Sequence, residues 1–327
     1  MKAAWYQSAG AAMEVIRVGE QPTPQPARGE VRVRVHFSGV NPSDVKARAG
    51  TRGAPPYPLI IPHSDGAGVI DALGADVAAE RLGQRVWIWN AAWRRPYGSC
   101  AQYVCLPAQQ AVPLPEHTPF EAGACFGIPA MTACHATLGD GPVAGQTVLV
   151  TGGAGAVGHY AIQFARWSGA MVITTVSSEA KARHAHAAGA DHVINYRTED
   201  VLTRVRELTH DEGVDRIVEV EFGGNLEVSR QVLKNGGTIA AYGSTAQPTP
   251  TLPFYPLLFK HTTVHMLLVY VLTTAQRARA CELISRALAE DRLRHAIAQC
   301  FPLADTAQAH LAVESGRAMG NVLVAID

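Results

Sequence analysis

The sequence predicts an α/β protein of two domains, one irregular and rich in β-strands and the other a doubly wound parallel sheet. Up to about residue 123, short alternating segments lie between turns rich in proline and glycine, and helical patterns are sparse. From about residue 124, strand-like apolar runs alternate with helical runs of about ten to fifteen residues, which is typical of a parallel sheet. The length of 327 residues also exceeds what one hydrophobic core usually supports.

The first domain is expected to form short strands joined by turns. The segment GEVRVRVHFSGV, residues 29–40, alternates valine with charged residues, as a half-buried strand does. Further short strands are predicted at residues 67–74 and 84–89. The clearest helical signal in this domain covers residues 43–50, directly after an Asn-Pro pair.

The second domain is expected to alternate strands with helices. Glycines follow several of its helical patterns, as they do at helix C-termini: Gly169, Gly189 and Gly236. The strand-like runs are residues 147–152, 171–176, 191–196, 214–222 and 238–244. A last apolar run, TTVHMLLVYVL at residues 262–272, is interpreted as a buried strand.

The end of the chain is expected to return to the first domain. An amphipathic helical pattern over residues 273–291 and a final strand at 320–327 do not extend the parallel sheet in an obvious way. We therefore predict a β-rich domain made of residues 1–123 and 269–327, and a parallel-sheet domain made of residues 124–268.

Composition narrows the class of partner. The chain carries 28 basic and 28 acidic residues, so it lacks the sequence-wide positive charge that favours nucleic acid or anionic membranes. No apolar run reaches the roughly 18 residues of a membrane-spanning helix, and the N-terminus lacks a secretory apolar core. No pair among the six cysteines has CxxC spacing, which favours free thiols over a disulfide framework. We expect a cytoplasmic protein that acts on a small molecule.

The segment TVLVTGGAGAVGHYAIQFAR, residues 147–166, is the strongest functional signal. A strand-like run meets a cluster of glycines, and a helical pattern follows. In such a turn the N–H groups of the helix N-terminus can approach a pyrophosphate. We therefore predict dinucleotide binding, the alternative being a purely structural turn. The residues assigned to the phosphates are Gly152, Gly155, Ala156, Val157 and Gly158.

The dinucleotide is predicted to be NADPH. NAD sites usually carry Asp or Glu roughly 20 residues after the glycines, at the end of the second strand. Val176 occupies that position here, so no carboxylate would repel a 2′-phosphate, and two serines and a lysine follow. Glu179 is the opposing signal, although it is expected to open the next helix and point away. The residues assigned to the adenosine end are Ser177, Ser178, Lys181 and Tyr196.

Further motifs along nearly the whole chain carry a family resemblance. They are GVNPSDVKARAG (39–50), HSDGAGVI (63–70), GSCAQYV (98–104), GIPAMTACHA (127–136) and SGRAMGNVLV (315–324). Together with the glycine turn they resemble the medium-chain dehydrogenase/reductase superfamily, and within it the zeta-crystallin-like quinone oxidoreductases. The resemblance implies a GroES-like catalytic domain, a Rossmann domain, NADPH bound between them and a quinone that accepts hydride.

The resemblance also implies roles for individual residues. Asn41, Asp44 and Thr132 would serve catalysis, with Thr132 touching nicotinamide or ribose. Asn41 would bind the ribose or the substrate oxygen, or would only cap the helix that follows it. Further cofactor contacts are implied for Ile128, Thr132, Gly243, Ser244, Leu268, Val269, Met319, Gly320 and Asn321.

The same comparison argues against zinc. Zinc enzymes of the superfamily take catalytic ligands from positions that match about Ser38, His63 and Ile128, of which only the histidine could ligate. One imidazole cannot build a three-ligand catalytic site. Residues 86–97 also contain no cysteine for a structural zinc lobe. We predict no metal, with His63 in the substrate pocket or in a structural hydrogen bond.

Two features depart from the family pattern, and both concern the substrate. Lys46 and Arg52 stand where family members often carry tyrosines, which removes phenol donors. An aromatic segment lies where the family's substrate loop should be. Its Trp89 and Trp93 are candidates to stack on a flat acceptor, whereas Trp87 is expected in the core.

Three functions remain open at this point. The first is an NADPH:quinone oxidoreductase, because without a metal the acceptor must take hydride readily. The second is an NADPH-dependent reductase of activated alkenes such as enals or enoyl thioesters, and the third is a non-catalytic NADPH-binding protein. We also expect a homodimer or higher homo-oligomer, because an apolar run at the edge of the sheet would need covering.

Overall fold

The computed structural model describes residues 1–51 and 53–326, and the chain divides into two compact units. Residues 1–128 and the C-terminal segment that starts at His295 form the first unit, and Pro129–Arg294 form the second. Within the described residues, no helix has both the length and the apolar character needed to cross a membrane.

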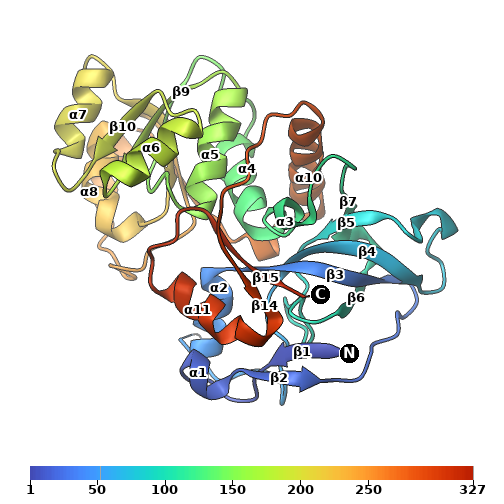
Figure 1. The fold of residues 1–327 in the computed structure, drawn as a ribbon. Coiled ribbons are helices and arrows are strands. Elements are labelled where there is room, and N and C mark those ends of the chain that lie inside the picture. Colours follow the sequence, from blue (N-terminus) through green and yellow to red (C-terminus); the bar gives the residue numbers. More distant parts are fainter. Residues whose placement is uncertain (52, 327) are drawn as a thin grey trace. The chain divides into compact units, whose positions relative to one another are not determined.

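The first unit is built on a seven-stranded sheet and a separate two-stranded ribbon. Its strands are β1 (Lys2–Trp5), β2 (Arg17–Glu20), β3 (Glu30–Val40), β4 (Asp65–Leu73), β5 (Arg85–Ile88), β6 (Tyr103–Pro107), β7 (Ala111–Pro113), β14 (Ile297–Pro302) and β15 (Asn321–Ala325). The sheet order is β14-β15-β3-β4-β5-β7, with β6 also paired to β3 (Figure 1). Strands β1 and β2 pair antiparallel with each other.

Strand β3 shows how the sequence forms this sheet. Val31, Val33 and Val35 are fully buried, while the arginines between them reach solvent. This confirms the predicted half-buried strand, and the unit as a whole has the predicted β-rich character. Its helices are α1 (Ala12–Val15), α2 (Pro42–Ala49), α3 (Phe120–Gly123) and α11 (Thr306–Glu314), with 3-10 turns at Ala79–Arg81, Ala108–Gln110 and Leu303–Asp305.

The second unit is a six-stranded parallel sheet with helices. Its strands are β8 (Thr147–Val150), β9 (Met171–Val176), β10 (His192–Asn195), β11 (Val214–Glu219), β12 (Leu233–Ala241) and β13 (Thr263–Met266). Its helices are α4 (Met131–Leu138), α5 (Ala156–Trp167), α6 (Glu179–Ala187), α7 (Val201–Leu208), α8 (Phe222–Val232), α9 (Phe254–Phe259) and α10 (Thr274–Ala289).

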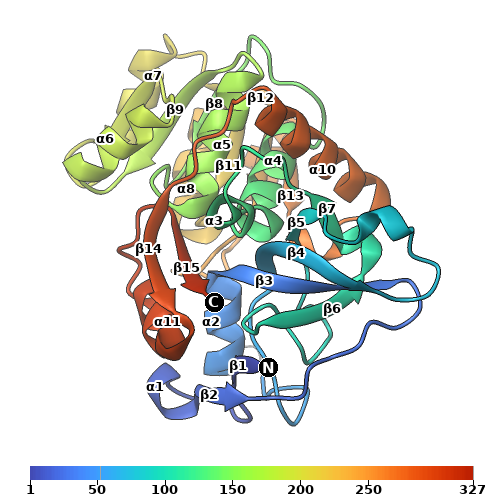
Figure 2. The same cartoon turned by 45° about the vertical axis from the view of Figure 1, so that its right-hand side comes forward.

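The order of these strands is β10-β9-β8-β11-β12-β13, and each neighbouring pair is parallel. The chain therefore reverses direction across the sheet between β8 and β11, which makes a topological switch point. Helices α4 and α5 lie side by side (Figures 1 and 2), and α7 packs with α8. Because crossovers are right-handed, helices before and after the switch point cover opposite faces. The predicted doubly wound fold is confirmed.

The boundaries of the two units differ from the predicted ones. The prediction placed residues 269–294 with the first domain, whereas they cluster with the second. Helix α10 packs on α4, where the Cys134 thiol lies 4.0 Å from the Ala280 carbonyl. Arg277 at the start of α10 donates to the Val269 carbonyl at 2.8 Å. These contacts hold the helix in the parallel-sheet unit.

The interpretation of residues 262–272 as a buried strand is wrong. Strand β13 covers only Thr263–Met266 and is the outermost strand of the sheet, so it has a neighbour on one side alone. Met266 is 67% exposed, and the run ends in a 3-10 turn at Val269–Val271. The apolar composition of the run did not distinguish an edge strand from a buried one, because burial of a strand depends on which other elements pack against it.

Candidate functional site

The carboxyl ends of the six strands of the second unit meet at one edge of its sheet, because neighbouring strands are parallel. Strand β8 leads into the glycine turn, β9 into Ser177, β10 into Tyr196, β12 into Gly243 and β13 towards Leu268. Doubly wound sheets bind ligands at this edge, beside the switch point. The fold thus brings these predicted residues to one side of the sheet.

The glycine turn has the backbone that its sequence requires. Gly152 has φ +69°, a left-handed conformation that residues with side chains rarely adopt. A Cβ at Gly158 would overlap the Gly152 carbonyl, and one at Gly153 would overlap the Thr174 hydroxyl. Gly155 differs, because it is exposed and a Cβ there would meet only the Gly152 oxygen, at 3.4 Å. Gly155 therefore leaves space on its open side.

Helix α5 presents its first N–H groups on that open side. Ala156, Val157 and Gly158 are its first three residues, so their N–H groups have no carbonyl one turn earlier in the helix. Gly155 is the N-cap and provides no side-chain cap. The first helical bond joins the His159 N–H to the Gly155 carbonyl at 2.9 Å. The positive end of the helix dipole adds to these donors, so a phosphate group fits here.

Helix α8, which starts on the other side of the switch point, has its N-terminus closed by the protein. The Phe222 N–H donates to the Gly243 carbonyl at 2.8 Å, and the Gly223 N–H donates to the Ser244 hydroxyl at 2.9 Å. A Cβ on Gly223 would overlap the Gln247 carbonyl, so the loop after β12 lies directly on this helix end. Of the two helices that start at the switch point, α5 is the one that can receive a ligand anion.

A buried carboxylate joins the two central strands, and sequence reasoning missed it. Glu219, the last residue of β11, is fully buried. Its Oε1 accepts hydrogen bonds from the Thr151 hydroxyl at 2.7 Å and the Asn225 amide at 2.9 Å, and its Oε2 accepts one from the Ser229 hydroxyl at 3.2 Å. Thr151 begins the glycine turn, so Glu219 anchors that turn to β11. A glutamate within the apolar run VDRIVEVEF was the available signal.

The end of β9 carries the features predicted for the adenosine end. Val176 is the last residue of the strand and is buried. Two serines follow, and the hydroxyl of Ser178 caps α6 by accepting the Lys181 N–H at 3.3 Å. Glu179 opens α6 as predicted, and its exposed carboxylate lies 3.8 Å from Arg183, one turn along the helix. The Glu179 carboxylate therefore lies along the surface of α6, towards Arg183.

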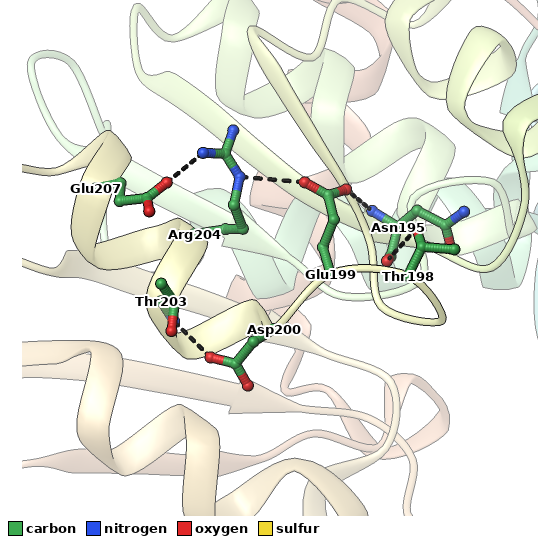
Figure 3. A network of polar contacts seen from close by, with 7 residues as sticks. All are labelled: Asn195, Thr198, Glu199, Asp200, Thr203, Arg204 and Glu207. Atoms are coloured by element: carbon green, nitrogen blue, oxygen red, sulfur yellow. Dashed lines mark hydrogen bonds and ion pairs between the residues drawn. The ribbon is translucent and has the colours of Figure 1, made fainter.

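Tyr196 lies beside the end of β9. Its N–H donates to the Val176 carbonyl at 3.0 Å, and the residue is 52% exposed. Polar contacts hold the loop that carries it (Figure 3), since Glu199 accepts from the Asn195 N–H at 2.8 Å and from the Arg204 guanidinium at 3.1 Å. These contacts give Tyr196 a defined place beside the predicted adenosine position.

A pocket of about 320 Å³ lies at the ends of β12 and β13. Its lining is mostly apolar and consists of Phe222, Ala241, Tyr242, Gly243, Ser244, Pro248, Pro250, Met266, Leu267 and Leu268. Gly243, Ser244 and Leu268, all predicted near the nicotinamide, share this pocket. Val269, the residue after Leu268, is buried, and Thr132 is buried in α4. A flat ring with a polar edge suits this lining.

In the first unit, Asn41 forms hydrogen bonds with Asp44 and with Asp65, a residue that sequence reasoning missed. The Asn41 N–H donates to the Asp44 carboxylate at 2.8 Å, an exchange typical of a helix N-terminus. The Asn41 side-chain amide donates to the Asp65 carboxylate at 2.8 Å. Burial raises the pKa of Asp65 well above its ordinary value, although the Asn41 hydrogen bond opposes the rise. Asn41 is the N-cap of α2, as the capping alternative predicted.

His63 lies in a buried chain of hydrogen bonds in the same unit. Its Nδ1 is 2.9 Å from the Ser38 hydroxyl, and its Nε2 is 3.0 Å from Nε2 of His310. The Ser38 hydroxyl lies 2.8 Å from that of Ser99, which donates to the Asp65 carbonyl. Burial lowers the pKa of both histidines, to about 3 for His310, so both rings are neutral. Both ring nitrogens of His63 are thereby engaged.

The positions matched to zinc ligands do not present a ligand set. Ser38 and His63 are hydrogen-bonded to each other, and Ile128 contributes an alkyl side chain from a π-helical turn, Phe126–Ala130. Among residues 1–51 and 53–326, no three His, Cys, Asp or Glu side chains are grouped so that they could hold a metal ion. The six cysteines are free thiols.

The C-terminal motif returns beside α2. Gly320 has φ +94°, and Asn321 donates from its N–H and from its side-chain amide to the Ala296 carbonyl, at 2.8 and 3.0 Å. Because β15 pairs antiparallel with the end of β3, Asn321 lies next to Asn41. The backbone N–H and the side-chain amide of Asn321 thus each donate a hydrogen bond within the fold, which the motif alone did not indicate.

In the aromatic segment, Trp87 lies in the core, as predicted. That side chain is fully buried, with its ring 5.8 Å from that of Phe126 in an edge-to-face contact. Trp89 and Trp93 are partly exposed, and the Arg94 guanidinium lies 5.5 Å above the Trp93 ring. The substitution of a family tyrosine by Arg52 lies outside the described residues.

Comparison with known proteins agrees with this architecture. Residues 27–116 match the alcohol dehydrogenase GroES-like domain, and residues 156–286 match the zinc-binding dehydrogenase family. The first match lies in the β-rich unit and the second in the parallel-sheet unit. The fold and its site therefore define a two-domain oxidoreductase of the alcohol dehydrogenase type.

Individual relatives narrow this class. A quinone oxidoreductase of Sus scrofa is 31% identical over 288 residues, which covers 88% of this chain and 86% of the relative. A 2-haloacrylate reductase of Burkholderia sp is 28% identical over 326 residues, which covers 95% and 93%. The crystal structure of Escherichia coli quinone oxidoreductase complexed with NADPH has a TM-score of 0.88 at 26% identity, covering 99% of this chain and 100% of that one. The chain belongs to the medium-chain dehydrogenase/reductase superfamily, within the zeta-crystallin-like quinone oxidoreductases.

Proposed function

We propose that this chain is an NADPH-dependent reductase that transfers a hydride to a quinone. The observation that carries the proposal is the N-terminus of α5 beside the glycine turn, where N–H groups and open space suit a pyrophosphate. The relatives support it, because a quinone oxidoreductase and an NADPH complex both match this chain over most of its length.

The proposed contacts divide according to the parts of the cofactor, which supplies the hydride when bound. Backbone N–H groups of Ala156, Val157 and Gly158 hold the pyrophosphate. The hydroxyls and the ammonium group at the end of β9 hold the 2′-phosphate, with Tyr196 beside them. The residues proposed for the nicotinamide end are Ile128, Thr132, Gly243, Ser244, Leu268, Val269, Gly320 and Asn321.

The chain's part in the chemistry is to bind a flat acceptor, orient it and exclude water. Trp89 and Trp93 are proposed to stack on the acceptor ring. Asn41 and Asp44 are proposed as positioning residues for the start of α2, since Asn41 donates to the carboxylates of both Asp44 and Asp65. His63 is proposed as structural, because it is fully buried and both ring nitrogens are engaged.

We propose that the reaction needs no zinc. A quinone accepts hydride without a Lewis acid, because the negative charge spreads across the ring to the opposite oxygen. The donor chemistry also supports this, since a serine, a hydrogen-bonded histidine and an isoleucine stand at the matched positions.

A second candidate function is reduction of an activated alkene. It is favoured by the match to a 2-haloacrylate reductase over 95% of this chain. Such an alkene accepts hydride at carbon and then needs a proton, and Asp65 lies too deeply buried to supply it directly.

The deciding experiment is cofactor oxidation followed by absorbance. NADPH and NADH are tested in parallel against benzoquinones, naphthoquinones, enals and 2-haloacrylate. Rapid NADPH oxidation with quinones, and much slower oxidation of NADH, is expected. Alkene turnover without quinone turnover would favour the second candidate, and NADPH binding without any turnover would contradict both.

We further propose that the chain forms a homodimer or higher homo-oligomer through β13 and α9. The edge of β13 carries unpaired backbone groups beside exposed aromatic side chains, with Phe254 60%, Tyr255 65% and Phe259 80% exposed. Pairing of identical edges across a two-fold axis would cover this surface. Light scattering after gel filtration tests it, with Phe259→Glu expected to lower the mass towards that of one chain.

A further inference from the structure

The loop after β12 shapes the pocket without regular structure of its own. Residues 242–253 between β12 and α9 contain no helix or strand, and residues 245–249 are exposed. Ser244 and Pro248 of this loop nevertheless line the 320 Å³ pocket. One wall of the pocket thus depends on a segment that burial does not hold in place.

The carboxylate of Glu221 holds this loop. Its Oε2 accepts the N–H groups of Thr245 at 2.7 Å and Ala246 at 3.0 Å, and its Oε1 accepts that of Gln247 at 3.4 Å. Successive N–H groups that converge in this way form a concave anion site. Burial alone would raise the pKa of Glu221, but these hydrogen bonds lower it below its ordinary value, so the carboxylate is ionised.

The anchor is itself rigid. Glu221 directly precedes α8, and its N–H donates to the buried Glu219 carboxylate at 2.7 Å. The Ser244 hydroxyl accepts the Gly223 N–H at 2.9 Å and donates to the Gln247 carbonyl at 2.6 Å, which fixes the same loop a second time. The loop therefore takes its position from the end of β11, at the centre of the sheet.

We propose that Glu221 is a positioning residue that sets the nicotinamide end of the cofactor site by holding residues 244–247. This inference rests on the proposed function. The adenosine end lies on α5 and α6, which Glu221 does not contact. Loss of the Glu221 carboxylate should therefore weaken recognition of one end of the cofactor and leave the other intact.

The test compares NADPH with 2′,5′-ADP, a probe that carries adenosine with a 2′-phosphate and one 5′-phosphate but no nicotinamide. For Glu221→Ala we expect the Kd of NADPH to rise about tenfold and kcat with a quinone to fall by about tenfold, while the Kd of 2′,5′-ADP stays within about twofold. Glu221→Gln keeps an oxygen for Thr245 and Ala246 and should recover most of the loss. Acetate added to the alanine variant should also recover part of it, by refilling the anion site.

The control is Glu227→Ala on the same helix, where an exposed carboxylate pairs along α8 with Arg230 and accepts from the Gln231 amide. It should change none of these values. Equal weakening of NADPH and 2′,5′-ADP by Glu221→Ala, or no change in either, overturns the proposal. If the alanine variant does not fold, Glu221→Gln decides. We expect its Kd for NADPH to rise about threefold while its Kd for 2′,5′-ADP is unchanged. A Kd for NADPH equal to that of the wild-type chain overturns the proposal. Failure of the wild-type chain to bind 2′,5′-ADP would instead contradict the proposed function.

Discussion

At the scale of single residues, the glycines of the turn are required for different structural reasons. Gly152 needs its left-handed backbone, and Gly153 and Gly158 lack a side chain because neighbouring atoms occupy that space. Gly155 has room for one within its own chain. The open position is the one a ligand would fill, which separates folding from binding inside one motif.

This difference predicts how alanine substitutions affect stability. Gly158→Ala should lower the free energy of unfolding by about 1–3 kcal/mol, because the new methyl group overlaps the Gly152 carbonyl. Gly155→Ala should cost less than about 1 kcal/mol, since it changes only an exposed N-cap. Urea denaturation followed by circular dichroism measures both. An equal or larger cost at Gly155 would contradict this account of the turn.

The end of β9 leads to a prediction about cofactor choice. Ser177→Asp would place a carboxylate beside the proposed 2′-phosphate, so kcat/KM with NADPH should fall by about 10–100-fold while that with NADH stays within about threefold. Steady-state kinetics with both cofactors measures the ratio. Glu179→Ala is the control, because the Glu179 carboxylate lies towards Arg183 and should leave the ratio unchanged. An unchanged ratio in Ser177→Asp would place the phosphate elsewhere.

At the scale of elements, the buried histidines tie α11 to the sheet of the first unit. Ser38 belongs to β3, His63 precedes β4 and His310 lies on α11. The hydrogen bonds between them span segments far apart in sequence. Burial, followed by the nearby Arg48 charge, lowers the pKa of His310, so the folded chain disfavours a proton charge on this ring.

This connection predicts loss of stability in acid. The pKa of His310 is about 3 in the folded chain and 6.5 in the unfolded chain. Between these pH values the unfolded chain binds more protons, so unfolding becomes easier as the pH falls. The loss for His310 alone should be about 2 kcal/mol between pH 6.5 and 5.

The measurement is urea denaturation across that pH range with His310→Gln, whose amide can still donate to His63. The variant should show a shallower pH dependence than wild type, by about the same 2 kcal/mol. Parallel curves for the two proteins would show that His310 is not held neutral by the fold.

At the scale of the whole molecule, residues 156–286 match the zinc-binding dehydrogenase family. The positions matched to zinc ligands nevertheless hold a serine, a histidine hydrogen-bonded to it and an isoleucine. We propose that the zinc in the description of this family belongs to other members of the shared fold. What distinguishes members is the set of side chains on that fold, since function depends on the site and not on the architecture.

Metal removal should therefore leave activity unchanged. Dialysis against a strong chelator is expected to preserve the rate of quinone reduction, because no step in the proposed reaction uses a Lewis acid. Elemental analysis of the purified chain should find zinc far below one atom per chain. A rate that falls on dialysis and returns with added zinc would overturn the proposal.

The fold and the position of the glycine turn could be predicted because they depend on local pattern. Alternation in residues 29–40 produced β3, and the glycine cluster located the turn before α5. The partners of Glu219, Glu221 and Asp65 could not be found this way, since each acts on segments that the chain brings near only after folding.

The sequence by itself determined the two-domain α/β architecture, the glycine turn and the family, because periodicity and motif spacing are local properties. Tertiary structure alone decided that β13 lies at the edge, that residues 269–294 pack in the parallel-sheet unit, and which helix N-terminus is open. It also decided that the amides of Asn41 and Asn321 serve the fold. Burial and hydrogen-bond partners come from segments distant in the chain, so no local pattern encodes them.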